Sequence, residues 1–214
     1  KKKKNMADIT KNGIIVNPSK GSGDTTLKVK AQTANRGNRV KQTATFTVTA
    51  PGVTGSKQFT ANHLPAAEFV SFDNGSTQAV DKAGGKITIT GTSNSSILTF
   101  TKGSGEIITT DISALSYTAN GSSATNGVKI DDDPGASAKY AFNIQLDATA
   151  NDTIESRTQQ ITVKAESTSV SATITLNQTA GDPTLEVSPT SVDVPQDGSE
   201  VSVQVTTNTT FIVA

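Results

Sequence analysis

Apolar and polar residues alternate along most of the chain, which is the pattern of half-buried β-strands. Three such runs follow one another within residues 140–181, at 142–148, 161–165 and 172–176. A period of two places the apolar side chains of each run on one side of a pleated sheet. No 3.6-residue periodicity persists for three helical turns anywhere in the sequence. The pattern therefore predicts an all-β protein.

Parts of this pattern occur twice at a nearly constant spacing. Residues 25–65 match residues 140–181 at an offset of 115–116, including a Thr-Ala-Asn segment that ends at Asn35 and again at Asn151. Residues 86–94 match residues 200–208 at an offset of 114. Self-similarity at a fixed period marks a tandem array. A period near 115 fits an immunoglobulin-like (Ig-like) sandwich of about 100 residues, so we expect tandem Ig-like β-sandwich domains.

The repeat divides the chain into four parts. We expect a basic N-terminal arm (1–7), a short or incomplete Ig-like domain (8–66), a whole Ig-like domain (67–182) and the start of a further repeat (183–214). Neither end segment is long enough to bury a sandwich core by itself. Two explanations are open: the natural chain continues past Ala214, or strands within 183–214 complete the N-terminal half of another copy.

Composition narrows the choice of partners. The 214 residues carry 19 basic and 19 acidic side chains and no cysteine, so the formal net charge is zero. A neutral chain is not expected to bind nucleic acid or an anionic membrane. The lack of cysteine excludes disulfides, a thiolate nucleophile and a cysteine-held zinc ion. No apolar run approaches the ~18 residues of a membrane span, and no signal-peptide core follows the basic start.

Few side chains offer catalytic or metal-binding chemistry. His63 is the only histidine, and it takes the repeat position of Gln178, at a strand end, which predicts a surface or junction residue. No Gly-x-Ser-x-Gly motif of a serine hydrolase occurs. Asp131, Asp132 and Asp133 have the oxygen ligands that Ca²⁺ prefers. Their spacing is not that of an EF-hand, so a solvated turn is favoured over a calcium site. We predict no enzyme, no catalytic residue, no cofactor and no metal.

Two features bear on which partner the chain could bind. Sugar platforms use exposed Trp or Tyr rings, and the chain has no Trp and only Tyr117 and Tyr140, which leaves at most weak glycan contact. The run of lysines at the start is either a solvated tail or a basic arm that docks on an acidic partner. The candidate partner-binding residues are Lys1, Lys2, Lys3, Lys4, Ile14, Ile15 and Val16.

The last 32 residues show an ordered set of signals. Two short strands flank Ser188-Pro189, a turn follows at Gly198, valines alternate over 201–205, and then come Asn208 and Phe211. This order resembles the opening of a BACON-type bacterial Ig-like domain, in which the position of Phe211 often holds Trp.

Further segments extend this resemblance to about two thirds of the chain. Residues 175–181 resemble the closing signature of a BACON domain, and residues 16–29 resemble its middle turn. The close of the first unit, Asn62 to Pro65, departs from the family pattern. The resemblance implies an Ig-like fold, and carbohydrate binding is the role often ascribed to the family.

The resemblance also suggests where such a protein acts. BACON-like and other Ig-like modules occur on tailed-phage particles, notably those infecting gut Bacteroidetes. We therefore expect a virion structural protein, an auxiliary (decoration) capsid protein made in the host cytoplasm that displays Ig-like domains on the phage head and aids adhesion. Its partners would be the major capsid protein, other virion proteins and copies of itself. The alternative is a secreted or cell-surface Bacteroidetes Ig-like or carbohydrate-binding module, which an upstream signal peptide would favour.

Overall fold

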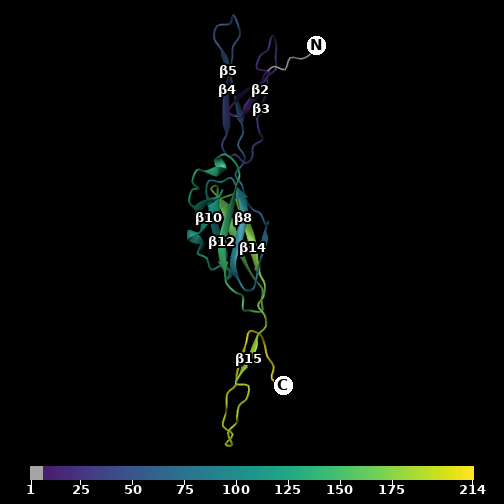
Figure 1. Cartoon of the computed structure of the whole chain (residues 1–214), viewed down its shortest axis with the longest axis vertical. Helices are drawn as coiled ribbons and strands as arrows, with labels where there is room; N and C mark the ends of the chain where they lie inside the picture. The colour runs from purple at the N-terminus through teal and green to yellow at the C-terminus, as the bar shows by residue number, and fades with distance from the viewer. Residues whose placement is uncertain (1–6) are drawn as a thin grey trace.

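The computed structural model describes residues 7–214, and its centre is a sandwich of two β-sheets around one apolar core (Figure 1). One sheet has the order β11-β10-β12-β8-β6 and the other the order β7-β14-β13-β9. The strands of the sandwich are β6 (Val70–Phe72), β7 (Thr77–Val80), β8 (Gly85–Ser93), β9 (Leu98–Lys102), β10 (Ser116–Ala119), β11 (Ser122–Thr125), β12 (Tyr140–Ala148), β13 (Arg157–Ala165) and β14 (Ser171–Gln178).

The strand order defines this sandwich as Ig-like. In chain order β6, β8, β10 and β12 take the places of strands A, B, D and E in one sheet. Strands β9, β13 and β14 take the places of C, F and G in the other sheet. Strand β7 pairs in parallel with β14, whereas the other ladders of the described residues are antiparallel. The prediction of an all-β, Ig-like sandwich fold is confirmed.

The core follows from the alternation of apolar residues. Ile144, Ile161 and Ile174 are fully buried on facing strands. The Phe100 ring meets the rings of Tyr117 and Phe142 edge to face, with centroids 5.1 and 5.7 Å apart. The core also includes apolar side chains between residues 97 and 117. Ile97 is half-buried, and the buried ones are Leu98, Phe100, Ile107, Ile108, Ile112, Leu115 and Tyr117.

Residues 7–66 form two small sheets and are called the N-terminal unit below. Strands β1 (Ile9–Lys11), β2 (Ile14–Asn17) and β3 (Lys28–Ala31) form one sheet, and β4 (Gln42–Val48) pairs with β5 (Lys57–His63) in the other. The sheets share a small core made of Ile14, Val16, Ala44 and Phe46, against which Phe59 and Ala61 pack.

Residues 183–214, called the C-terminal unit below, form a single hairpin of β15 (Leu185–Ser188) and β16 (Gln204–Thr207). The alternating valines predicted a strand from Val201 onward, but the strand begins only at Gln204. In the sandwich, the equivalent strand β8 pairs with β12 over its whole length. No described strand flanks residues 201–203 in this way, so their backbone is not held in a ladder.

The three parts follow one another along one long axis, with the N-terminal unit and the C-terminal unit at opposite ends of the sandwich (Figure 1). The only helical segments of the described chain are the 3-10 turns η1 (Ile112–Ala114) and η2 (Pro134–Ala136). Over residues 7–214 there is no helix long and apolar enough to cross a membrane. Any functional surface of the described chain is therefore carried by strands, turns or the junctions between units.

Candidate functional site: two equivalent joints

The N-terminal unit meets the sandwich at a polar junction that we call joint 1, formed by residues 35–39, 64–69, 93–96 and 133–140. Its central side chain is the fully buried Asn94, directly after β8. The Asn94 amide nitrogen donates to the carbonyl oxygens of Gly37 (3.0 Å) and Ala67 (2.9 Å), and its oxygen accepts from the Phe69 N–H (2.9 Å). One side chain therefore ties the N-terminal unit to the linker and to the residue directly before β6.

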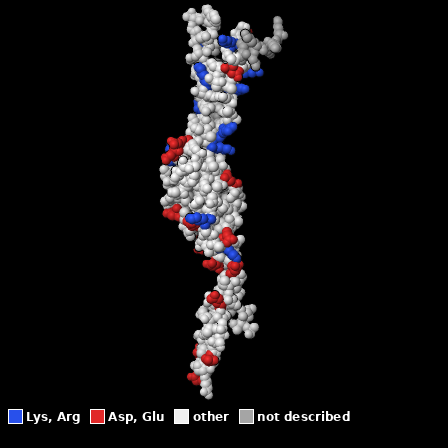
Figure 2. All heavy atoms as spheres, viewed as in Figure 1, with Lys and Arg blue, Asp and Glu red and all other residues white. Residues whose placement is uncertain are grey.

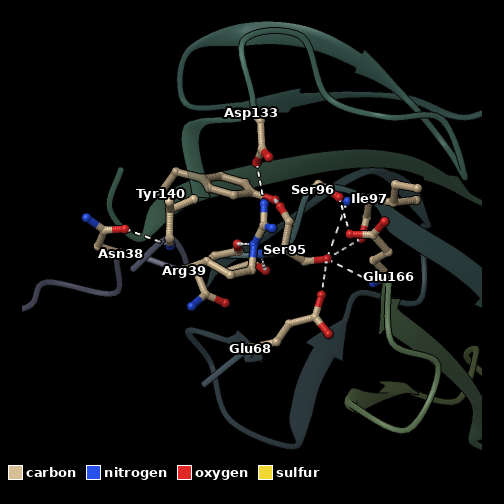
Figure 3. Close-up of polar contacts among 12 residues, drawn as sticks. Asn38, Arg39, Glu68, Ser95, Ser96, Ile97, Asp133, Tyr140 and Glu166 are labelled. Atoms are coloured by element: carbon tan, nitrogen blue, oxygen red, sulfur yellow. Dashed lines mark hydrogen bonds and ion pairs between the residues drawn. The ribbon is translucent and has the colours of Figure 1, made fainter. Parts of the chain in front are cut away.

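Arg39 adds a charged contact to joint 1 (Figure 3). Its Nε donates to the backbone oxygen of Asn94 (2.8 Å), and its Nη2 lies 2.5 Å from the carboxylate of Asp133. The Arg39 N–H also donates to the Gly135 carbonyl (3.1 Å). Both partners of this ion pair are largely buried, so removal of one leaves a partly desolvated charge.

The acidic cluster of residues 131–133, which the sequence predicts to be a solvated turn rather than a calcium site, contributes one of its members to joint 1. Asp133 faces Arg39, and Asp131 and Asp132 form the turn before it. Within residues 7–214, no group of three or more His, Cys, Asp or Glu side chains is placed to hold a metal ion.

Glu68 lies on the other side of joint 1 and links its residues through hydrogen bonds. Its carboxylate accepts from the Ser95 hydroxyl (2.7 Å) and from the Ser167 N–H (3.1 Å), while the Ser95 oxygen also accepts from the Glu166 N–H (2.8 Å). Burial by itself raises the pKa of Glu68. The hydrogen bonds from Ser95 and Ser167 and the charge of Arg39 act in the opposite direction and leave this pKa below its ordinary value. The carboxylate is therefore a stable anion at neutral pH.

The sandwich meets the C-terminal unit at joint 2, which repeats the three bonds of the central asparagine of joint 1. Asn208, which lies 114 residues after Asn94, donates to the carbonyl oxygens of Asp152 (2.8 Å) and Asp182 (2.9 Å). Its side-chain oxygen accepts from the Thr184 N–H (2.9 Å). Each of these three partners lies 115 residues after the corresponding partner of Asn94.

A second pair of asparagines is repeated in the same way. Asn35 donates to the Leu64 carbonyl (3.0 Å), and Asn151 donates to the Thr179 carbonyl (2.9 Å), which lies 115 residues after that of Leu64. Each side-chain oxygen accepts from a backbone N–H two residues further on, that of Gly37 or Thr153. These bonds shape the turn that presents its carbonyl to Asn94 or to Asn208.

The two joints differ in their ion pairs. Joint 1 has the largely buried pair of Arg39 and Asp133, whereas joint 2 has Lys82 and Asp182 at 2.6 Å, both well exposed. An exposed pair contributes little to stability because water competes for both charges. The shared asparagine bonds therefore set the common geometry, and joint 1 is reinforced more strongly.

The predicted site residues lie apart from these joints, or outside the described residues. Lys1, Lys2, Lys3 and Lys4 precede residue 7. The side chains of Ile14 and Val16 are buried in the core of the N-terminal unit, and Ile15 is half-buried. His63 ends β5 opposite Gln42.

Both tyrosines are buried. Tyr117 contacts Phe100, and the Tyr140 hydroxyl donates to the backbone oxygen of Ser95 (2.8 Å) next to joint 1. Burial raises the pKa of Tyr117 to about 12 and also raises the pKa of Tyr140. Neither ring offers an exposed flat face to a sugar.

The asparagines of the joints were the functional residues that sequence reasoning missed. The repeat did match Asn35 with Asn151 and Asn94 with Asn208. The signal that could have identified them is that a polar residue recurs at the end of a matched strand. The sequence does not show how far each of these side chains is buried or which backbone groups it reaches, because those groups lie up to 57 residues away.

Comparisons with known proteins assign no family to this chain. No family model matches the chain, and no curated protein matches it. A Bacteroides thetaiotaomicron protein solved by NMR is 14% identical, over 63% of this chain and 97% of that one, with a TM-score of 0.27. Cadherin-like domains 1 to 4 of zebrafish RET are 8% identical, over 83% of this chain and 40% of theirs, with a TM-score of 0.33.

Fold and joints together define the class of the protein. It is an all-β protein with an Ig-like sandwich flanked at both ends by strands of the same repeat, held in line by two equivalent joints.

Proposed function

We propose that this chain is a non-enzymatic structural protein of a virion, an auxiliary (decoration) capsid protein that carries Ig-like units away from a phage head. The observation that carries the proposal is the repeated joint. Two junctions with the same asparagine bonds give consecutive units the same attachment, which suits a spacer that holds surfaces at a fixed distance. The BACON-like order of residues 183–214 favours a phage of Bacteroidetes as the source.

In this proposal the N-terminal end faces the capsid. Between residues 7 and 66 there are eight Lys or Arg side chains and two Asp, and four more lysines precede them. Such an end suits an acidic surface of the major capsid protein or of another virion protein. Since Ile14 and Val16 are buried in the N-terminal unit, the contact would use its basic side chains.

The second candidate is a secreted or cell-surface Ig-like module of a Bacteroidetes bacterium. The extended arrangement of units suits a surface spacer equally well. Carbohydrate binding is the weaker part of this candidate because Tyr117 and Tyr140 are buried.

A density-gradient separation of the source culture, with mass spectrometry of each fraction, tests the proposal. We expect peptides of this chain to peak with DNA-filled particles, at a constant ratio to the major capsid protein. Peptides that occur only in the cell envelope or in the free supernatant would reject the virion assignment and favour the bacterial surface module. Washing the particles at high salt then tests the charged contact, because screening weakens attachment through exposed charges.

A further inference from the structure

The two end units carry complementary halves of one Ig-like sandwich. Strands β3, β4 and β5 of the N-terminal unit lie 115 residues before β12, β13 and β14. The pairing of Phe46 with Phe59 repeats that of Ile161 with Ile174. Strands β15 and β16 likewise repeat the pairing of β6 with β8. The N-terminal unit thus supplies strands E, F and G, and the C-terminal unit supplies A and B.

Within the sandwich these two halves are held together by three ladders. Strand β12 pairs with β8, β13 pairs with β9, and β14 pairs in parallel with β7. Among the described residues, β3 pairs only with β2, while β4 and β5 pair only with each other. The β3 and β5 edges that bind the first half of a repeat in the sandwich therefore have no strand partner in the N-terminal unit, whereas the β4 carbonyls of Thr43 and Thr45 accept from the side chains of Asn12 and Lys11.

Exposure of equivalent apolar residues shows the same incompleteness. Ile144 on β12 is 0% exposed, but its counterpart Val29 on β3 is 45% exposed. Ile89 on β8 is 0% exposed, and its counterpart Val203 is 43% exposed. In the sandwich, Ile144 and Ile89 stand directly opposite each other. Both end units therefore expose the side chains that would form the interior of a completed sandwich.

The charges of the end units are also complementary. Residues 7–66 carry eight basic and two acidic side chains, whereas residues 183–214 carry four acidic side chains and no basic one. Figure 2 shows the basic residues gathered toward the N-terminal end and only acidic residues on the C-terminal unit. Attraction between opposite charges favours contact between the N-terminal unit of one copy and the C-terminal unit of another, and repulsion between like charges disfavours contact between two identical ends.

We propose that the C-terminal unit of one copy completes the Ig-like sandwich of the N-terminal unit of a second copy, so that copies join head to tail. Strand β16 and the residues before it pair antiparallel with β3, as β8 pairs with β12. Because Gln145 stands opposite Thr88, the register places Lys30 of one copy opposite Ser202 of the next. The contact is heterologous and open-ended, since each copy keeps one free end. It does not depend on a virion location.

Cysteine cross-linking tests the register without background, because the chain contains no cysteine. We expect the full chain with Lys30→Cys and Ser202→Cys to form a ladder of dimers, trimers and longer species on oxidation. The matched control carries Lys30→Cys with Gln204→Cys, which is two residues out of register. At least about fivefold less product is expected from it, because a disulfide requires Cα atoms within about 7 Å.

Sedimentation velocity of the full chain tests the association itself. We expect the sedimentation coefficient to rise with protein concentration, and to rise less at high salt. A Val203→Asp change should weaken the association between copies about tenfold or more, because it places a charge in the shared core. The matched control Ser202→Asp lies on the outer face, opposite Lys30, and should not weaken it. Tyrosine fluorescence checks that the sandwich is intact in each variant.

Two results would overturn the proposal. A wild-type chain that stays monomeric at ~100 μM, well above a micromolar dissociation constant, would show that a second copy does not complete the sandwich. That result would assign the open edges to further residues of a longer chain. A cross-link confined to single chains would also reject the head-to-tail contact. Neither result bears on whether the protein occurs in virions, which the gradient experiment decides separately.

Discussion

An Asn94→Ala variant tests the central bond set of joint 1. The change removes three hydrogen bonds and leaves the Phe69 N–H and the carbonyl oxygens of Gly37 and Ala67 without that partner. Asn94 is 0% exposed, so water does not readily replace its side chain. Leaving a buried polar group unpaired costs about 1 kcal/mol or more. We therefore expect a loss of about 3 kcal/mol, which lowers the melting temperature of a sandwich of this size by roughly 10 °C.

Tyrosine fluorescence during urea unfolding of the full chain measures this loss. The chain has no Trp, and its only two tyrosines lie in the sandwich, so the signal reports on that unit. Asn208→Ala is the matched control, because it removes the equivalent three bonds at joint 2, where the side chain is only half-buried. We expect it to change the sandwich transition by less than about 1 kcal/mol, since water can reach the freed groups. Equal effects of the two variants, or no effect of either, would refute the assignment of Asn94 as a buried tie.

Three further predictions concern packing and pH. A Cβ on Gly135 would lie 1.9 Å from the Asn94 carbonyl oxygen, so Gly135→Ala should lower the free energy of unfolding by about 2 kcal/mol. The control Gly103→Ala, whose new Cβ would lie 3.6 Å from its nearest neighbour, should not, and urea unfolding compares the two variants. Because the folded-state pKa of Glu68 is lowered, its stabilising effect is present above the unfolded-state pKa of about 4.5 and is lost as the pH falls through the folded value. The melting temperature should therefore fall less between pH 7 and pH 3 for Glu68→Gln than for wild type, and an equal fall in both proteins would contradict this. The pKa values of Tyr117 and Tyr140 are raised, to about 12 for Tyr117, so their contribution to stability is present below pH 10 and is lost as the pH rises through the folded-state values. Absorbance at alkaline pH should show both phenols titrating above pH 10, and ordinary titration would contradict their burial.

The alternation of apolar residues was sufficient to predict β12, β13 and β14 of the sandwich. Phe142, Ile144 and Leu146 point to one side of β12 because a strand has a period of two, and all three are buried. The repeat near 115 residues likewise predicted Ig-like units and matched the asparagines that form the joints. These features are local, or need only a comparison of the chain with itself, so the sequence carries them directly.

Tertiary structure decided which of the patterned residues are covered. Val29 and Val203 have the same alternation as Ile144 and Ile89, yet they are exposed, because burial depends on a neighbouring strand and not on the residue itself. The small polar residues that follow β8 resemble a surface loop, but Asn94 is buried because the turn at Gly37 covers it. A sequence determines the period and the propensity of each strand, whereas its partners come from segments far away in the chain, and only the folded arrangement specifies them.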